Sequence, residues 1–317
     1  MTISVTNAPA PAVGAGPVSA PAAGPSPSKA KAEAPGTGGA GSAAVVVSLS
    51  VQAQTIVATG SAAPAAASPY ARYFPTRDGA PASALATAVS NPGAVSSSAG
   101  KSFDQVAKDA RARMDAVYAA MEKSGKPFDY NSHEGKDWYS LMGDLDRRSL
   151  YAVSSNAEGL FTKQEQDMAQ SIMSQQQGLA MGLYNGPISQ EGTFTDRFLG
   201  NDAQRMKAGV AFLDGVSDEE KTSITWGVSR ASAQISYEWL SERDGNPPED
   251  LDTENPLAKL IKAAMNTMKG SEERGWTKGN ISTAEELKSQ AWFQGFESQL
   301  DDALRKTREM ATRGSGA

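Results

Sequence analysis

Cysteine is absent from the 317-residue chain, and histidine occurs once, at His133. Without cysteine the chain can form no disulfide, thiolate zinc site, iron–sulfur cluster or thiol nucleophile. A single histidine also excludes a metal site built on two imidazoles, such as the HExxH pattern. His133 stands in a polar stretch between two expected helices, and the chain has no GxSxG elbow whose serine it could activate. We therefore predict an exposed loop histidine and assign no catalytic residue.

Charged residues are scarce in the first hundred positions, which hold six of the 66 charged side chains. The same stretch holds 12 of the 17 prolines, and alanine, glycine and serine make up most of the rest. Such a composition buries too little apolar surface to offset the chain entropy lost on folding. The sequence therefore predicts a disordered Ala/Pro/Gly/Ser-rich arm over 1–100 and an all-helical domain over 101–313.

Long hydrophobic runs are also missing, because no run approaches the roughly 18 apolar residues of a membrane-spanning helix. The N-terminus has no cation before Lys29 and no apolar core of a Sec signal peptide. Residues 101–317 carry 26 basic and 34 acidic side chains, a balance that disfavours binding to nucleic-acid phosphates. We expect a soluble protein without membrane span or nucleic-acid partner, either cytoplasmic or exported by a leaderless route of the flagellar or type III kind.

One apolar island, residues 44–58, interrupts the arm with valine, leucine and isoleucine. It could fold on a partner as a linear interaction motif, as apolar segments of disordered regions do. It could equally pack back onto the folded domain. The sequence leaves both alternatives open, because short apolar runs do not distinguish strand from helix.

Helical periodicity dominates residues 101–317, and no segment alternates in the manner of a β-strand. Four predicted helix starts carry a capping box, in which Ser or Thr precedes Glu or Gln by three residues. Another start places proline at the first helical position, after an asparagine cap. The sequence thus predicts an all-α fold, a bundle of about seven helices behind the long arm. The predicted starts are Ser102, Lys136, Thr162, Asp202, Ser217, Asn255 and Ser282.

Helix boundaries follow from the same spacing. Apolar residues from Trp138 to Ala152 predict one continuous helix, whose charged outer face carries Arg147 and Arg148. The next helix is expected to continue as far as the Asn-Gly-Pro sequence at 185–187, since glycine and proline end helices.

Residues 154–165 have the sequence Ser-Ser-Asn-Ala-Glu-Gly-Leu-Phe-Thr-Lys-Gln-Glu, which resembles the calcium loop of the EF-hand family. That loop has oxygen ligands at positions 1, 3, 5, 7, 9 and 12, glycine at position 6 and an apolar residue at position 8. Ser154 replaces the usual aspartate at position 1, so only two carboxylates would face the ion and any affinity should be weak. The resemblance implies the ligands Asn156, Glu158, Leu160 (through its carbonyl), Thr162 and Glu165.

The second half of the same pattern recurs at 274–285. The ligand positions of its first half hold cations, Arg274 and Lys278, which would repel calcium, so this loop is expected to be free of metal. Both loops also have a simpler interpretation. Glycine, an apolar residue, Ser or Thr and then Glu three residues later is the usual sequence of a turn into a capped helix.

Three classes of function remain open. We favour a non-enzymatic protein-interaction or regulatory protein whose partner is another protein, which predicts an exposed apolar patch or groove. The first alternative is a calcium-responsive regulator that works through loop 154–165, and no other cofactor is expected. The second is a helical hydrolase, which predicts a carboxylate pair with raised pKa values in a concave pocket.

Overall fold

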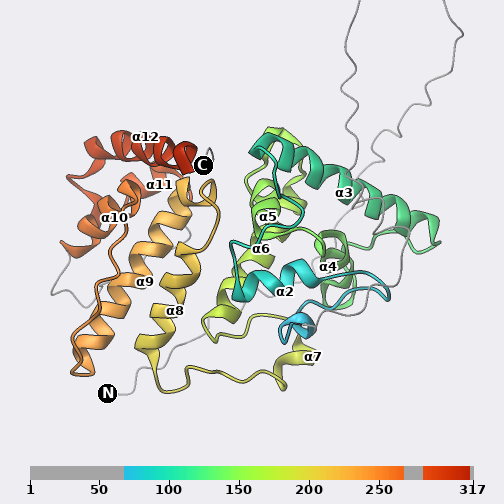
Figure 1. Cartoon of the computed structure of the whole chain (residues 1–317), viewed down its shortest axis with the longest axis horizontal. Helices are drawn as coiled ribbons and strands as arrows, with labels where there is room; N and C mark the ends of the chain where they lie inside the picture. Colours follow the sequence, from blue (N-terminus) through green and yellow to red (C-terminus); the bar gives the residue numbers. More distant parts are fainter. Residues whose placement is uncertain (1–67, 268–280, 315–317) are drawn as a thin grey trace, which may run out of the picture. The chain divides into compact units, whose positions relative to one another are not determined.

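Helices form the regular structure of the computed structural model, which describes residues 68–267 and 281–314 (Figure 1). No strand occurs in these two ranges, which confirms the predicted all-α class. None of the helices within them combines the length and the apolar character needed to cross a membrane. The apolar island at 44–58 and most of the second EF-hand-like loop, residues 274–280, lie outside the described residues.

Eleven α-helices and five short 3₁₀ segments occupy the described ranges. About seven helices were expected, and the number is larger because two predicted helices are divided, into α4 with α5 and α11 with α12, and because α2 and α7 lie outside the predicted helices. The first six are α2 (Ser83–Ser90), α3 (Phe103–Lys123), α4 (Lys136–Met142), α5 (Arg147–Ser154), α6 (Lys163–Ala180) and α7 (Ile188–Glu191). The others are α8 (Asp202–Asp214), α9 (Ile224–Arg243), α10 (Pro256–Asn266), α11 (Ala284–Lys288) and α12 (Glu297–Gly314).

Two large hydrophobic clusters form the core. The first collects buried side chains mainly from α2 to α6 and from α8, and the second collects those of α9 to α12. Helix α9 packs between α8 and α10 (Figure 1) and contributes to both clusters, with Trp226 in the first and Val228 in the second. Helix α9 is therefore covered on two sides, although Trp239 near its C-terminal end is exposed.

The folded chain begins well before residue 100. Residues that the composition assigned to the arm form η1 (Ala71–Tyr73) and α2, and the side chains of Phe74 and Leu85 are fully buried in the first cluster. The Gln176 amide in α6 also donates to the Leu85 carbonyl, at 3.2 Å. The compositional boundary fails here because a short helix of small apolar residues packs against the domain without needing charged residues of its own.

The helix predicted over 136–152 is two helices. Glycine at position 143 lies so close to other backbone that an added Cβ would meet the Pro81 carbonyl oxygen at 1.8 Å. Three residues later the Asp146 carboxylate accepts a hydrogen bond from the Ser149 backbone N–H, at 2.9 Å, and caps α5. The break turns Arg147 inward, so its predicted place on an outer charged face is wrong.

Other helix ends also differ from the prediction. Helix α6 stops at Ala180 because Gly182 adopts a left-handed conformation (φ +70°), and Leu183 beyond it is 44% exposed. Helix α9 starts after Ser223, since residues 220–222 form a separate 3₁₀ turn, η4 (Glu220–Thr222). The starts at Ser102, Thr162 and Asn255 are confirmed, each with the expected cap.

Candidate functional site

Loop 154–165 has the backbone of a tight turn. Asn156, Glu158 and Gly159 all adopt left-handed conformations, with φ between 51° and 69°. The Asn156 side-chain oxygen accepts a hydrogen bond from the Phe161 backbone N–H, at 3.0 Å, and the Glu158 side chain is exposed. Of the five predicted ligands, the structure brings together only Thr162 and Glu165, whose Oγ1 and Oε2 atoms lie 3.0 Å apart.

Glu165 is the buried end of this loop, with 3% of its surface exposed. Its carboxylate accepts hydrogen bonds from the Thr162 backbone N–H at 2.8 Å, from Arg111 Nη1 at 2.9 Å and from the Tyr118 hydroxyl at 3.2 Å. Burial alone would raise the pKa of Glu165, but the Thr162 N–H and the Arg111 guanidinium together hold it below its ordinary value. A calcium ion here would compete with Arg111 for the same oxygens, so the donor set does not fit the metal as it stands.

Asp196 and Glu238, two carboxylates that a hydrolase pair could use, are each paired with a cation. Asp196 is bound by Arg205 at 2.7 Å, and Glu238 by Lys262 at 2.8 Å. Wherever a carboxyl pKa is shifted in the described ranges, it is shifted downward, the opposite of what a general acid needs. Residues 68–267 and 281–314 contain no group of three or more His, Asp or Glu side chains placed to hold a metal ion.

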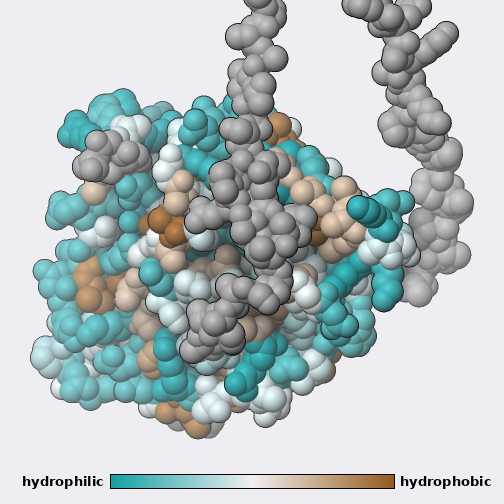
Figure 2. Space-filling model, turned by 45° about the vertical axis from the view of Figure 1, so that its right-hand side comes forward, coloured by the Kyte–Doolittle hydropathy of each residue, from teal (hydrophilic) through white to brown (hydrophobic). Residues whose placement is uncertain are grey.

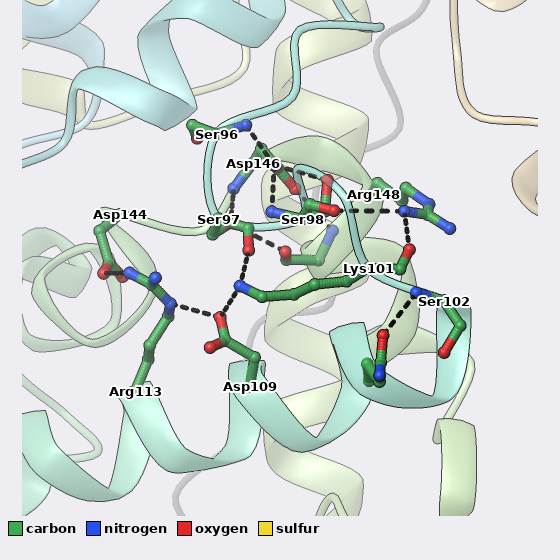
Figure 3. Close-up of polar contacts among 12 residues, drawn as sticks. Ser96, Ser97, Ser98, Lys101, Ser102, Asp109, Arg113, Asp144, Asp146 and Arg148 are labelled. Atoms are coloured by element: carbon green, nitrogen blue, oxygen red, sulfur yellow. Dashed lines mark hydrogen bonds and ion pairs between the residues drawn. The ribbon is translucent and has the colours of Figure 1, made fainter. Parts of the chain in front are cut away.

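A buried cluster of serine hydroxyls surrounds Asp146 (Figure 3). One Asp146 oxygen accepts hydrogen bonds from the Ser96 and Ser98 backbone N–H groups, at 2.7 and 2.8 Å, and from the Ser98 hydroxyl. The Ser97 and Ser149 hydroxyls lie 2.8 Å apart beside it. The Ser97, Ser98 and Ser149 side chains are too deeply buried to meet a substrate, so the cluster anchors the chain before α3 to the start of α5.

The cations around this cluster serve the same anchoring role (Figure 3). Lys101 donates to the Ser97 backbone carbonyl and pairs with Asp109 at 3.0 Å, and it makes no contact with a serine hydroxyl that it could activate. Arg113 lies between Asp109 and Asp144, with contacts of 2.6 and 2.7 Å. Asp109 and Asp144 therefore each have a cation as partner, whereas the Asp146 carboxylate is held by backbone N–H groups and a serine hydroxyl.

Two adjacent arginines on α5 join it to the η4 turn. Arg147, 3% exposed, donates to both carboxylate oxygens of Glu220, at 2.7 and 3.0 Å, and its guanidinium lies over the Phe212 ring. Arg148 binds Glu219 in the same two-point manner. These contacts are structural, and the sequence reasoning missed them because neither charge pair lies within one helix.

Aromatic side chains gather beside the C-terminal half of α3, and among them Tyr130 is exposed, Tyr118 and Phe128 are partly buried and Trp138 is buried. The Phe128 ring meets the rings of Tyr118, Tyr130 and Trp138 edge-to-face, with centroids 4.8 to 5.1 Å apart. The Tyr118, Phe128 and Tyr130 rings border a shallow pocket open to solvent, which we call the aromatic pocket. Its lining residues are Tyr118, Ala119, Glu122, Pro127, Phe128 and Tyr130.

The loop that carries the pocket is fixed in place by hydrogen bonds from Arg77 and Trp138. Arg77 pairs with Asp137, with Nε and Oδ1 2.6 Å apart, and donates through Nη2 to the Pro127 carbonyl at 2.9 Å. The Trp138 indole N–H donates to the Tyr130 carbonyl at 3.1 Å. Tyr130 therefore stays 56% exposed on a fixed backbone instead of collapsing into the core.

The aromatic pocket is distinct from a broad apolar surface. On the face drawn in Figure 2, strongly hydrophobic colour appears only in small areas separated by hydrophilic surface. Sequence reasoning did not single out the pocket. The available signal was the presence of two aromatic residues, Phe128 and Tyr130, in a polar stretch expected to be a loop.

Comparison with known proteins adds no further evidence. No protein-family model, curated protein or solved structure matches the chain.

Proposed function

We propose that this protein is a non-enzymatic protein-interaction module, and that its aromatic pocket binds an extended, proline-containing segment of a polypeptide. The observation that carries the proposal is the set of edge-to-face rings around Phe128, held open with Tyr130 half-exposed. Pockets lined by aromatic rings are the usual receptors for polyproline II segments.

The chemistry of the lining suits such a ligand. A polyproline II segment is already extended and rigid, so little conformational entropy is lost when it binds. Its pyrrolidine rings can pack on the faces of Phe128 and Tyr130, and its carbonyls can accept a hydrogen bond from a tyrosine hydroxyl. Glu122 at the edge offers an acceptor for a backbone N–H or a cation.

The pocket is rigid, which favours ligand binding over a purely structural role for its aromatic residues. Tyr118 is fixed by its hydrogen bond to Glu165, and burial together with that carboxylate raises the pKa of Tyr118 well above its ordinary value. The hydroxyl therefore stays protonated at neutral pH and continues to donate to Glu165. Because the ring is already in place, a ligand would not have to order it.

The test is a titration of fluorescein-labelled decaproline with the full chain, followed by fluorescence anisotropy. We expect Tyr130→Ala to weaken binding by about tenfold or more, as truncation of a central interface tyrosine does. Leu199→Ala is the matched control, because it truncates an exposed apolar side chain outside the pocket, and we expect its affinity to stay within about twofold of the parent protein.

Thermal melts of both variants verify that they are folded. Equal binding by the parent protein and Tyr130→Ala would remove the aromatic pocket as the site. Absence of binding by the parent protein would overturn the proposed function.

A further inference from the structure

We infer that the polypeptide segment bound by the aromatic pocket carries an arginine among its prolines, and that this arginine stacks on the Tyr130 ring and pairs with the Glu122 carboxylate. The inference rests on the proposed function and deepens it by naming the charge of the ligand. Both groups line the same pocket, and neither has a cation as partner in residues 68–267 and 281–314.

Glu122 is the charged residue of the pocket lining, and the other lining residues are uncharged. It is exposed in the last turn of α3, and no lysine or arginine of the described ranges forms an ion pair with it. Lys123 and Lys126 are exposed close by in the sequence, but neither of them lines the pocket. The pocket therefore presents an unpaired negative charge to its ligand.

Two arginines that contact pocket residues are bound to other carboxylates. Arg77 holds the pocket loop and is paired with Asp137. Arg111 has its guanidinium 5.9 Å from the centre of the Tyr118 ring and is bound to Glu165 at 2.9 Å. Neither arginine pairs with the carboxylate in the pocket lining. A cation supplied by the ligand would complement that charge, and such complementarity selects between partners.

The Tyr130 ring supplies a surface for stacking. It is 56% exposed, and it meets the Phe128 ring edge-to-face with the two planes 89° apart. No lysine or arginine of the described ranges lies over Tyr130, whereas the Tyr118 ring already has Arg111. Because the face of an aromatic ring is electronegative, it attracts a guanidinium placed over it.

Arginine suits these two groups better than lysine does. Its guanidinium is planar, so it can lie flat on a ring and still direct two N–H groups at one carboxylate, whereas the lysine ammonium is a compact, strongly hydrated charge. The same combination occurs inside this protein. Arg147 donates to both carboxylate oxygens of Glu220 while its guanidinium lies 4.7 Å from the centre of the Phe212 ring. The aromatic pocket has the carboxylate and the ring of such a site, and the ligand would supply the arginine.

The experiment measures the binding of fluorescein-labelled peptides to the full chain by fluorescence anisotropy. The peptides are decaproline and three variants of it, in which the fifth proline is replaced by arginine, lysine or glutamine. Glutamine is the reference, because it interrupts the proline run without adding charge. We expect the arginine peptide to bind about fivefold more tightly than the glutamine peptide, with the lysine peptide between them.

Two variants of the protein locate the charge that causes this preference. In Glu122→Gln we expect the arginine and glutamine peptides to bind with equal affinity. Glu242→Gln is the matched control and should keep the fivefold preference. Like Glu122, Glu242 is exposed, is the next-to-last residue of its helix and has no ion pair among the described residues. Thermal melts verify that both variants are folded.

The outcomes distinguish the inference from the proposed function. Equal affinities of the parent protein for the arginine and glutamine peptides, both weakened by Tyr130→Ala, would overturn the inference and leave the proposed function intact. A preference for arginine that persists in Glu122→Gln, or that Glu242→Gln also abolishes, would overturn the inference as well. Absence of decaproline binding by the parent would overturn both.

Discussion

Two helix starts in this protein share one local sequence pattern but lie in different surroundings. Thr162 with Glu165 and Thr283 with Glu286 both form complete capping boxes, at the starts of α6 and α11. Glu286 is exposed and accepts hydrogen bonds from neighbouring residues of its own turn, such as the Ser282 backbone N–H at 2.7 Å.

Glu165 has a second role that Glu286 lacks. Its carboxylate also binds Arg111 and Tyr118 on α3, and Tyr118 lines the aromatic pocket. The motif itself sets only where a helix begins. Whether its glutamate also joins distant parts of the chain depends on what packs over it, and no local pattern contains that information.

The largest expected effect is on the free energy of unfolding, when the charge of each glutamate is removed in turn. Glu165→Gln leaves Arg111 without its buried partner, and we expect it to lower the free energy of unfolding by about 2–3 kcal/mol. Glu286→Gln removes contacts within an exposed turn, so its effect should be much smaller. Urea unfolding of both variants, followed by tryptophan fluorescence, measures the difference. Equal losses would mean that the contacts to α3 contribute nothing beyond the cap.

The second expected effect is a difference in acid sensitivity. The pKa of Glu165 is lower in the folded protein than its ordinary value of about 4.3, so its stabilisation is present above that pH and is lost as pH falls through the folded pKa. We therefore expect the stability gap between the parent and Glu165→Gln to be constant near neutrality and to narrow below about pH 4.3.

Urea midpoints measured from pH 3 to pH 7 test this dependence. Other lowered carboxyls, such as Asp146, are present in both proteins and cancel in the comparison. Glu286→Gln serves as the control, and its stability should stay close to that of the parent over the whole pH range. A difference in free energy of unfolding between the parent and Glu165→Gln that widens on acidification would contradict the lowered pKa of Glu165.

The smallest expected effect concerns calcium. Because Arg111 already binds the Glu165 carboxylate, millimolar calcium should leave the melting temperature of the full chain unchanged relative to EDTA or magnesium. Melts followed by tryptophan fluorescence measure this. A rise in melting temperature that is specific to calcium and absent in Glu165→Gln would establish the EF-hand-like loop as a metal site. It would also contradict the expectation that Arg111 keeps calcium from the Glu165 carboxylate.

Several features set by adjacent residues could be predicted from the sequence, although the start predicted at Ser282 is one residue early because Thr283, paired with Glu286, caps α11. The caps at Ser102, Thr162 and Asn255 each depend on a few neighbouring residues, and each is found as expected. The all-α class follows from the same local signals. The end of α6 was misplaced because Gly182 stops the helix before the stronger Asn-Gly-Pro sequence at 185–187.

Features that join distant residues could not be predicted. Arg147 looks like a surface charge on α5, but contacts with α6, with the Phe212 ring of α8 and with Glu220 of η4 make it a buried residue. The aromatic pocket likewise depends on Arg77, which holds Pro127 fifty positions later in the chain. The folded stretch 68–100 was assigned to the arm because its composition is that of the arm, whereas its burial comes from contacts with α5 and α6.

The Arg147–Glu220 pair bears on the order of events during synthesis. The two residues are 73 positions apart, which a ribosome covers in about 4 to 15 s at ordinary elongation rates. Until the η4 turn emerges, the Arg147 guanidinium lacks its carboxylate and is better solvated by water than buried in protein. The helices from α2 to α6 can therefore gather early on the nascent chain, but their core closes around Arg147 only after residue 220 has been translated.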